Sequence, residues 1–186
     1  MKRLLQIAAC LAIAAGAAWA TSRLYDVYVC NVRAKTAERR IIQLYSLNDE
    51  VTARIAARQI LDDMDRCIPC TPTDVNQYMV RAAALRMLGR PDEAANDYRR
   101  AMRYDRRAEL FLNLGEVELQ AGREREAEDA FSTAVFLLYS YIDNIPEPMQ
   151  TRVRSSVTPK FLLIQRGRAP QQLLDELRQR ITRDPL

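Results

Sequence analysis

Apolar side chains recur at three- and four-residue spacings along most of this chain of 186 residues. That spacing places them on one face of an α-helix, whereas a half-buried strand would alternate apolar and polar positions. Ala, Leu, Arg, Glu and Gln, which are good helix formers, dominate the composition, and runs of β-branched or aromatic residues are few. The pattern therefore predicts an all-α fold.

The stretch from residue 24 to residue 66 predicts a helical hairpin. Its first helix is expected over 24–47, with apolar positions at Leu24, Val27, Tyr28, Val32, Ile41, Leu44 and Tyr45. A turn is expected at 48–50. The second helix is expected to have one apolar face, which is formed by Val51, Ile55, Ile60, Leu61 and Met64.

One helix–turn–helix pattern occurs twice between residues 74 and 141. The step between the two copies is a constant 33 residues, and it relates Gly89 to Gly122, Ala94 to Ala127 and Ala101 to Ala134. A fixed period of this length indicates a repeat array, in which each helical pair buries its apolar side against its neighbour. The two glycines suit the left-handed position that ends a helix.

The last part of the chain, residues 147–186, is less regular and predicts capping helices. A short helix over 149–157 is expected to end before Pro159, and an apolar run follows at 161–164. A last helix is expected to begin at Pro170. Its apolar side is formed by Leu173, Leu174, Leu177 and Ile181. The polar outer face of this helix suits it to cover the apolar end of the array.

The residues at fixed places in the two copies resemble the tetratricopeptide repeat family. The matching positions are Tyr78, Ala82, Leu85, Ala94, Tyr98 and Ala101 in the first copy, and Phe111, Leu114, Gly115, Ala127, Phe131 and Ala134 in the second. The first copy departs from the family with Arg81 at the usual leucine, and residues 33–66 resemble a degenerate copy. The resemblance implies a right-handed α-solenoid of about three helical hairpins, followed by C-terminal capping helices.

In this family the first helix of each pair lines a groove that grips a peptide or a partner helix. By position, the resemblance implies a partner-binding groove formed by Asn76, Met79, Ala83, Arg86, Met87, Glu109, Leu112, Asn113, Glu116 and Gln120. The methionines and Leu112 predict an adaptable apolar contact, because Met repacks easily. The alternative interpretation is that these residues pack against the next repeat.

Residues 1–20 have the order of a targeting segment. Lys2 and Arg3 come first, an apolar run follows, and Ala18-Trp19-Ala20 stands at the end. One interpretation is a secretory signal peptide that is cut before Thr21. The other is an uncleaved helix that anchors the chain in the inner membrane. Both predict that the rest of the chain lies outside the cytoplasm, in the periplasm.

Three cysteines follow the targeting segment, and their spacing predicts a disulfide bond. If the helices on either side of Asn48 are antiparallel, Cys30 and Cys67 lie side by side, because they stand 18 residues before and 19 residues after that turn. Two alternatives are that Cys70 replaces Cys67 as the partner and that Cys70 pairs with Cys67 in a tight local loop. An oxidising compartment would allow the bond to form. The spacing Cys67-x-x-Cys70 also resembles a thioredoxin-type redox motif, although the βαβ context of that motif is absent.

Composition excludes several kinds of site. The chain has no histidine, which removes His-dependent triads and His-ligated zinc or haem. The net charge is +4, and 25 of the 28 basic residues are arginines, which suit a helix surface laced with ion pairs. We therefore expect no metal, no cofactor and no nucleic-acid partner.

Together these features predict a non-catalytic interaction module of the bacterial cell envelope, acting as an adaptor, scaffold or assembly factor. The expected partner is another envelope protein or a peptide segment, with membrane contact through residues 4–20 if they are not cleaved. Two alternatives stay open. One is a thiol–disulfide redox protein that acts through Cys67 and Cys70, and the other is a self-associating structural protein whose groove is filled by its own last helix.

Overall fold

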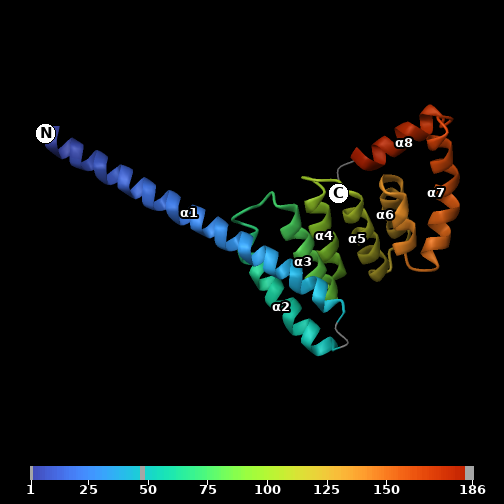
Figure 1. The fold of residues 1–186 in the computed structure, drawn as a ribbon, viewed down its shortest axis with the longest axis horizontal. Coiled ribbons are helices and arrows are strands. Elements are labelled where there is room, and N and C mark those ends of the chain that lie inside the picture. Colours follow the sequence, from blue (N-terminus) through green and yellow to red (C-terminus); the bar gives the residue numbers. More distant parts are fainter. Residues whose placement is uncertain (1, 47–48, 183–186) are drawn as a thin grey trace.

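The computed structural model describes the backbone of residues 2–46 and 49–182, and the side chains of these ranges from Leu11 onward. Within these ranges every regular element is a helix, which confirms the predicted all-α fold. The elements are α1 Lys2–Leu44, α2 Glu50–Cys67, α3 Val75–Met87, α4 Pro91–Ala101, α5 Ala108–Gln120, α6 Glu124–Leu137, the 3₁₀ helix η1 Tyr139–Asn144, α7 Met149–Gln165 and α8 Gln171–Thr182. Successive α-helices pack against one another from α1 to α7 (Figure 1).

The first helix is much longer than predicted and joins two segments that the sequence pattern separates. α1 runs without a break from Lys2 to Leu44, whereas the spacing predicts a helix only from residue 24. Thr21, at the expected cleavage position, is helical, and its hydroxyl donates a hydrogen bond to the carbonyl oxygen of Ala17 at 2.8 Å. Figure 1 shows the N-terminal part of α1 as a rod that projects from the rest of the molecule.

The projecting part of α1 exposes all its described side chains. From Leu11 to Asp26 every residue is exposed, and the indole of Trp19 is 69% exposed. Contiguous apolar side chains left in water mark a surface that contacts something else. Among the helices whose side chains are described, none is both long enough and apolar enough to cross a membrane.

The packed part of α1 uses a face of mostly small side chains. Its buried residues are Cys30, Ala34, Ala37, Ile41 and Leu44. The predicted apolar face is therefore right at Ile41 and Leu44, whereas four of its other members are exposed, namely Leu24, Tyr28, Val32 and Tyr45. Small side chains let α1 approach both α2 and α3 closely, and this fit decides which face packs.

The second helix shows the same partial agreement. α2 buries the predicted Ile60, Leu61 and Met64, together with Ala57 and Cys67. Val51 and Ile55, which were assigned to the same face by spacing, are exposed in the first turns of the helix. Asp49 caps α2 by accepting a hydrogen bond from the backbone N–H of Val51 at 3.0 Å.

The two repeat copies form the helical pairs α3–α4 and α5–α6, as the 33-residue step predicts. Gly89 and Gly122 follow α3 and α5 in the left-handed region, with φ values of +72° and +77°. Pro91 opens α4. The side chains at the repeat positions are buried between the helices, namely Tyr78, Ala82, Leu85, Ala94, Tyr98, Ala101, Phe111, Ala127, Phe131 and Ala134.

The C-terminal region covers α6, but its first helix does not end where predicted. α7 buries Met149, Val153 and Val157 and continues through Pro159 to Gln165. Proline removes one hydrogen bond from a helix. The ring of Phe161 stacks on Tyr139 at 4.6 Å between centroids, and this contact holds the turns that follow the proline.

The last helix lies back over α6 (Figure 1). Arg180 of α8 pairs with Asp129 of α6 at 3.0 Å. The guanidinium of Arg106, which follows α4, donates a hydrogen bond to the carbonyl oxygen of Ile181 at 2.6 Å. Leu177 is the buried residue of α8. These contacts put α8 against α6 and the end of α4.

Gly115→Ala is expected to destabilise the fold. An added Cβ would lie 2.6 Å from ring carbons of Phe131, which is fully buried. Overpacking costs about 1–3 kcal/mol, whereas alanine gains roughly 1 kcal/mol over glycine inside a helix. Urea unfolding should therefore show a net loss of up to about 2 kcal/mol.

The matched control for this variant is Gly16→Ala in the exposed part of α1. A Cβ added at Gly16 has no neighbour within 4 Å among the atoms of the described structure. This substitution should leave the free energy of unfolding unchanged or raise it slightly. Equal losses in the two variants would contradict the close contact between α5 and α6.

Candidate functional site

A pocket lies between the C-terminal part of α1 and the helices α3 and α5. Its volume is about 200 Å³. Among the predicted groove residues, Asn76, Met79, Ala83, Glu109 and Asn113 line it. The remaining wall is formed by Glu38, Ile41, Ile42, Tyr45, Val80 and Tyr98. We call this cavity the α1/α3/α5 pocket.

The contribution of α1 to the pocket was missed in the sequence analysis. Ile41 and Tyr45 were assigned to the apolar face of the first helix, but neither they nor Glu38 and Ile42 were assigned to the groove. The available signal was the predicted degenerate copy over 33–66, in which α1 would take the place of α3 and α5. Ile42 is 66% exposed and Tyr45 is 52% exposed, so both side chains offer surface to a partner.

Other predicted groove residues hold the helices together instead of lining the pocket. The Arg86 guanidinium donates a hydrogen bond to the Tyr45 hydroxyl at 2.6 Å and lies 5.1 Å from the centroid of that ring. Arg86 also pairs with Glu116 of α5. The side-chain amide of Gln120 donates to the Arg86 carbonyl oxygen at 3.5 Å. Arg86 therefore links α1, α3 and α5.

Burial separates the remaining predicted positions. Leu112 is only 8% exposed and Ala83 only 7%, so both belong mainly to the core. Met87 is half-buried against the core. The Arg107 guanidinium donates to the side-chain oxygen of Asn76 at 2.7 Å and lies 3.0 Å from the Met79 sulfur. Some of the predicted groove residues thus line the pocket, while others pack between the helices. Each of the two interpretations therefore applies to part of the set.

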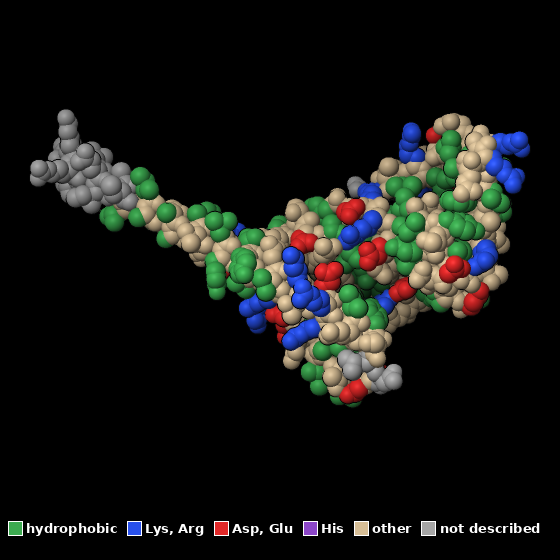
Figure 2. Space-filling view, in the orientation of Figure 1, with side chains coloured by type: hydrophobic (Ala, Val, Ile, Leu, Met, Phe, Trp, Pro, Cys, Tyr) green, Lys and Arg blue, Asp and Glu red, His purple; other side chains and the backbone are tan. Residues whose placement is uncertain are grey.

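A second, more open hollow continues along α5 toward η1. It has a volume of about 560 Å³ and is lined by Glu116, Leu119, Gln120, Asp143, Asn144, Ile145 and Pro146. Glu116 and Gln120 are predicted groove residues, so this hollow extends the same surface. Figure 2 shows acidic and basic side chains interspersed over the face of the molecule beside the base of α1.

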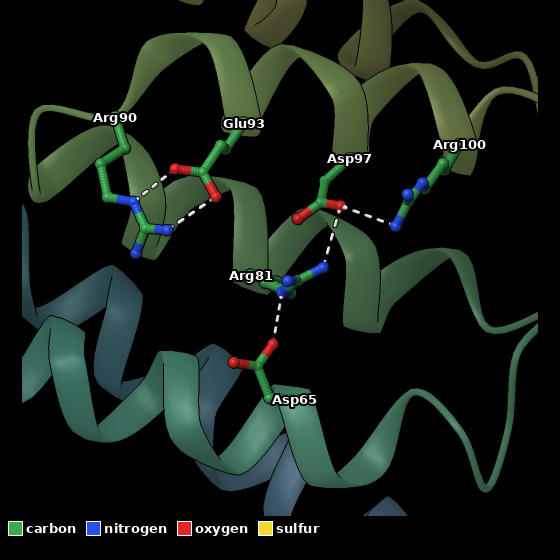
Figure 3. A network of polar contacts seen from close by, with 6 residues as sticks. All are labelled: Asp65, Arg81, Arg90, Glu93, Asp97 and Arg100. Carbon is green, nitrogen blue, oxygen red and sulfur yellow. Dashed lines mark hydrogen bonds and ion pairs between the residues drawn. The ribbon is translucent and has the colours of Figure 1, made fainter.

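Arg81, which replaces the leucine of the family pattern, is the centre of a polar network between three helices (Figure 3). Its Nε lies 2.8 Å from a carboxylate oxygen of Asp65 on α2, and its Nη1 lies 3.2 Å from Asp97 on α4. The side chain of Asp97 is only 3% exposed, and Arg100 approaches it at 3.9 Å. Burial raises the pKa of Asp97 to about 6, and the two arginines oppose this increase only in part.

The arginines clustered between residues 99 and 107 are largely engaged within the chain. Arg99 pairs with the buried Glu118, which also pairs with Arg123. Arg107 lies 3.7 Å from Asp105 and 3.8 Å from Glu109. Because these arginines lie beside carboxylates of the same chain, they favour a helix surface of balanced charge and not a site for an anionic partner.

The three cysteines of the described side chains lie together at the base of α1. Cys30 and Cys67 are buried and Cys70 is half-buried. All three thiols are free, and they lie close enough together that Cys67 and Cys70 both affect the pKa of the Cys30 thiol. Burial raises the pKa of the Cys30 and Cys67 thiols, and the neighbouring Cys30 thiol raises the pKa of Cys70. The neighbourhood of Cys30 and Cys67 agrees with the hairpin geometry, while the bond between them stays a prediction.

This environment gives little support to a redox-active pair. A nucleophilic cysteine needs thiolate character and therefore a lowered pKa, together with access to a client protein. Here the pKa of Cys67 is raised and its side chain is buried. Within the described residues, no group of three or more Cys, Asp or Glu side chains is arranged to hold a metal ion.

Asp97→Asn is expected to change how stability depends on pH. The native carboxyl holds its proton up to about pH 6, whereas the ordinary pKa of an aspartate in an unfolded chain is 3.8. The native state therefore binds more protons between these values, so the contribution of Asp97 is greatest below about pH 4 and is lost as pH rises through about 6. From about pH 4 to pH 7, the free energy of unfolding of the wild type should fall by up to about 3 kcal/mol relative to the variant.

Urea unfolding of both proteins at the two pH values measures this difference. Asp62→Asn, which alters an exposed carboxylate of α2, is the matched control and should show no such trend. If the difference in free energy of unfolding between wild type and Asp97→Asn stays constant with pH, burial does not raise the pKa of Asp97.

Oxidation of the cysteine cluster is expected to join Cys30 to Cys67 and to leave Cys70 free. The bond closes a loop of 37 residues and should stabilise the fold by about 3–4 kcal/mol over the reduced chain. Peptide mapping of the alkylated, unreduced protein by mass spectrometry identifies the pair. Cys70→Ser should keep the bond, and Cys67→Ser should transfer it to Cys70. Alkylation of all three thiols in protein isolated from cells would refute the bond.

Comparison with known proteins adds no family to this description. The chain matches no protein-family model, and it matches no curated protein. The tetratricopeptide resemblance therefore rests on the repeat positions of this sequence and stays a prediction.

Proposed function

We propose that this chain is a non-catalytic interaction module that holds a segment of a partner protein in the α1/α3/α5 pocket. The observation that carries the proposal is the lining of this pocket. The largely exposed Ile42 and the half-buried Met79 stand beside the polar side chains of Asn76, Glu109 and Asn113. Exposed apolar side chains at a cavity with polar edges are typical of binding sites.

The proposal includes a tetratricopeptide-type architecture. Two features support it: the constant step between the pairs α3–α4 and α5–α6, and the burial of the small and aromatic side chains at the repeat positions. In this proposal α1 and α2 form a degenerate first pair of a right-handed solenoid, and α7 and α8 form its C-terminal cap. The first helices α1, α3 and α5 then share the binding face.

We further propose that the module works in the bacterial cell envelope, as an adaptor, scaffold or assembly factor for another envelope protein. The basic start, apolar run and small-residue site within residues 1–20 support export. The exposed apolar and aromatic side chains of α1, including Trp19, support a contact of this helix with another apolar phase. Sequencing of the mature N-terminus distinguishes cleavage before Thr21 from an intact anchor, and recovery of the full chain in the cytoplasm would refute both.

Cross-linking in cells is expected to capture one dominant partner at the pocket. A photo-reactive side chain at Asn113, which is half-buried and lines the pocket, should form this adduct. Ile42→Glu should abolish the adduct, because it places a charge on the exposed apolar wall. Mass spectrometry of the adduct identifies the partner.

The control is the same substitution at a matched position outside the pocket. Ile55 of α2 is 56% exposed, close to the 66% of Ile42, and does not line the pocket. Ile55→Glu should therefore leave the adduct intact. Adducts that survive Ile42→Glu, or the absence of any specific adduct, would argue against this binding site.

A further inference from the structure

The α1/α3/α5 pocket has an acidic lining. Its charged lining residues are Glu38 from α1 and Glu109 from α5, and no arginine or lysine is among the residues that form it within the described structure. Glu38 has no ion-pair partner in the described part of the chain. The ion pair of Glu109 with Arg107 is long, at 3.8 Å. Both carboxylates therefore remain able to accept hydrogen bonds from a ligand.

The positive side chains near the pocket are Arg86 and Arg107, which make contacts within the chain, and Lys35, which lines an adjacent hollow with Glu38. Arg86 binds Glu116 and Tyr45, and the Arg107 guanidinium donates to Asn76. Neither arginine is one of the pocket's lining residues. An acidic side chain of a partner would therefore meet like charges at the pocket, whereas a basic side chain would find opposite charges.

Part of the pocket wall is apolar. Ile41, Ile42, Met79, Val80 and Ala83 form this part. Arginine and lysine combine an apolar stem with a charged head, and they bury the stem along apolar surface while the head stays at a polar edge. A cavity of about 200 Å³ is smaller than the roughly 300–1,000 Å³ of typical small-molecule sites, so it suits a single side chain.

We infer that the partner segment inserts one arginine or lysine side chain into this pocket. The stem packs against Ile42 and Met79, and the cationic head lies between Glu38 and Glu109. The neighbouring residues of the segment lie along α5 toward the second hollow. This inference rests on the proposed function, since it names the chemistry of the partner that the same pocket would hold.

Selection from a displayed library of random 12-residue peptides on the full-length protein tests the inference. Selected peptides should be enriched in arginine or lysine beside apolar residues. Replacing that arginine with citrulline, which keeps the shape and removes the charge, should weaken binding about tenfold. The double variant Glu38→Gln/Glu109→Gln should weaken binding of the original peptide by a similar factor.

The double variant Glu126→Gln/Glu128→Gln is the matched control, because it removes two carboxylates of α6 that do not line the pocket. It should bind the selected peptides as the wild type does. Ile42→Arg removes the apolar wall and places a like charge beside the proposed cation site, so it should lose the selected peptides. Peptides that lose binding to Ile42→Arg but show no basic residue would overturn this inference and leave the proposed function standing. If no peptide is selected, or if Ile42→Arg binds as well as the wild type, both fail.

Discussion

The fold depends on the pairing of a small residue in one helix with a large aromatic residue in the next. Gly115 of α5 faces Phe131 of α6 so closely that even a methyl group would meet the ring at 2.6 Å. One repeat earlier, the equivalent positions are Ala82 and Tyr98, and both are buried. Close packing of this kind gives each pair a fixed geometry, because little freedom remains to slide one helix past the other.

That fixed geometry carries through to the pocket. The pairs α3–α4 and α5–α6 present α3 and α5 in equivalent positions, and α1 joins them through its small buried side chains. Arg86 then ties the three helices together through Tyr45 and Glu116. The pocket wall is therefore made of side chains on helices whose positions are set by the core, which is what a preorganised binding surface requires.

The repeat was predictable because each of its signals is local. Gly89 and Gly122 end helices, and the alanines and aromatics recur at a fixed step, so the helical pairs follow from the sequence alone. The face of α1 was not predictable in the same way. Leu24, Tyr28 and Val32 have the spacing of a core face, but the small surface around Cys30, Ala34 and Ala37 fits α2 and α3. Spacing detects an apolar stripe, whereas the complementary shape of the neighbours decides which stripe packs.

The candidate site was only partly predictable for a related reason. The positions that the family resemblance implies identify five pocket residues on α3 and α5. They identify none of the pocket residues on α1, where the match to the repeat pattern is weak. Pro159 illustrates the opposite error. Its local signal predicts the end of a helix and is wrong here, because packing on both sides of it, at Val157 and at Phe161, outweighs the loss of one hydrogen bond.

The use of arginine in this chain explains how a basic protein can carry an acidic pocket. Three arginines each form an ion pair with a carboxylate on another helix, namely Arg81, Arg86 and Arg99. These ion pairs hold the helices together. The planar guanidinium suits such bridges because it can serve two partners at once. A net charge of +4 therefore says little about the surface that a partner meets. At the pocket, the charged side chains that form the lining are the carboxylates of Glu38 and Glu109, while the arginines reach the lining residues only from outside it.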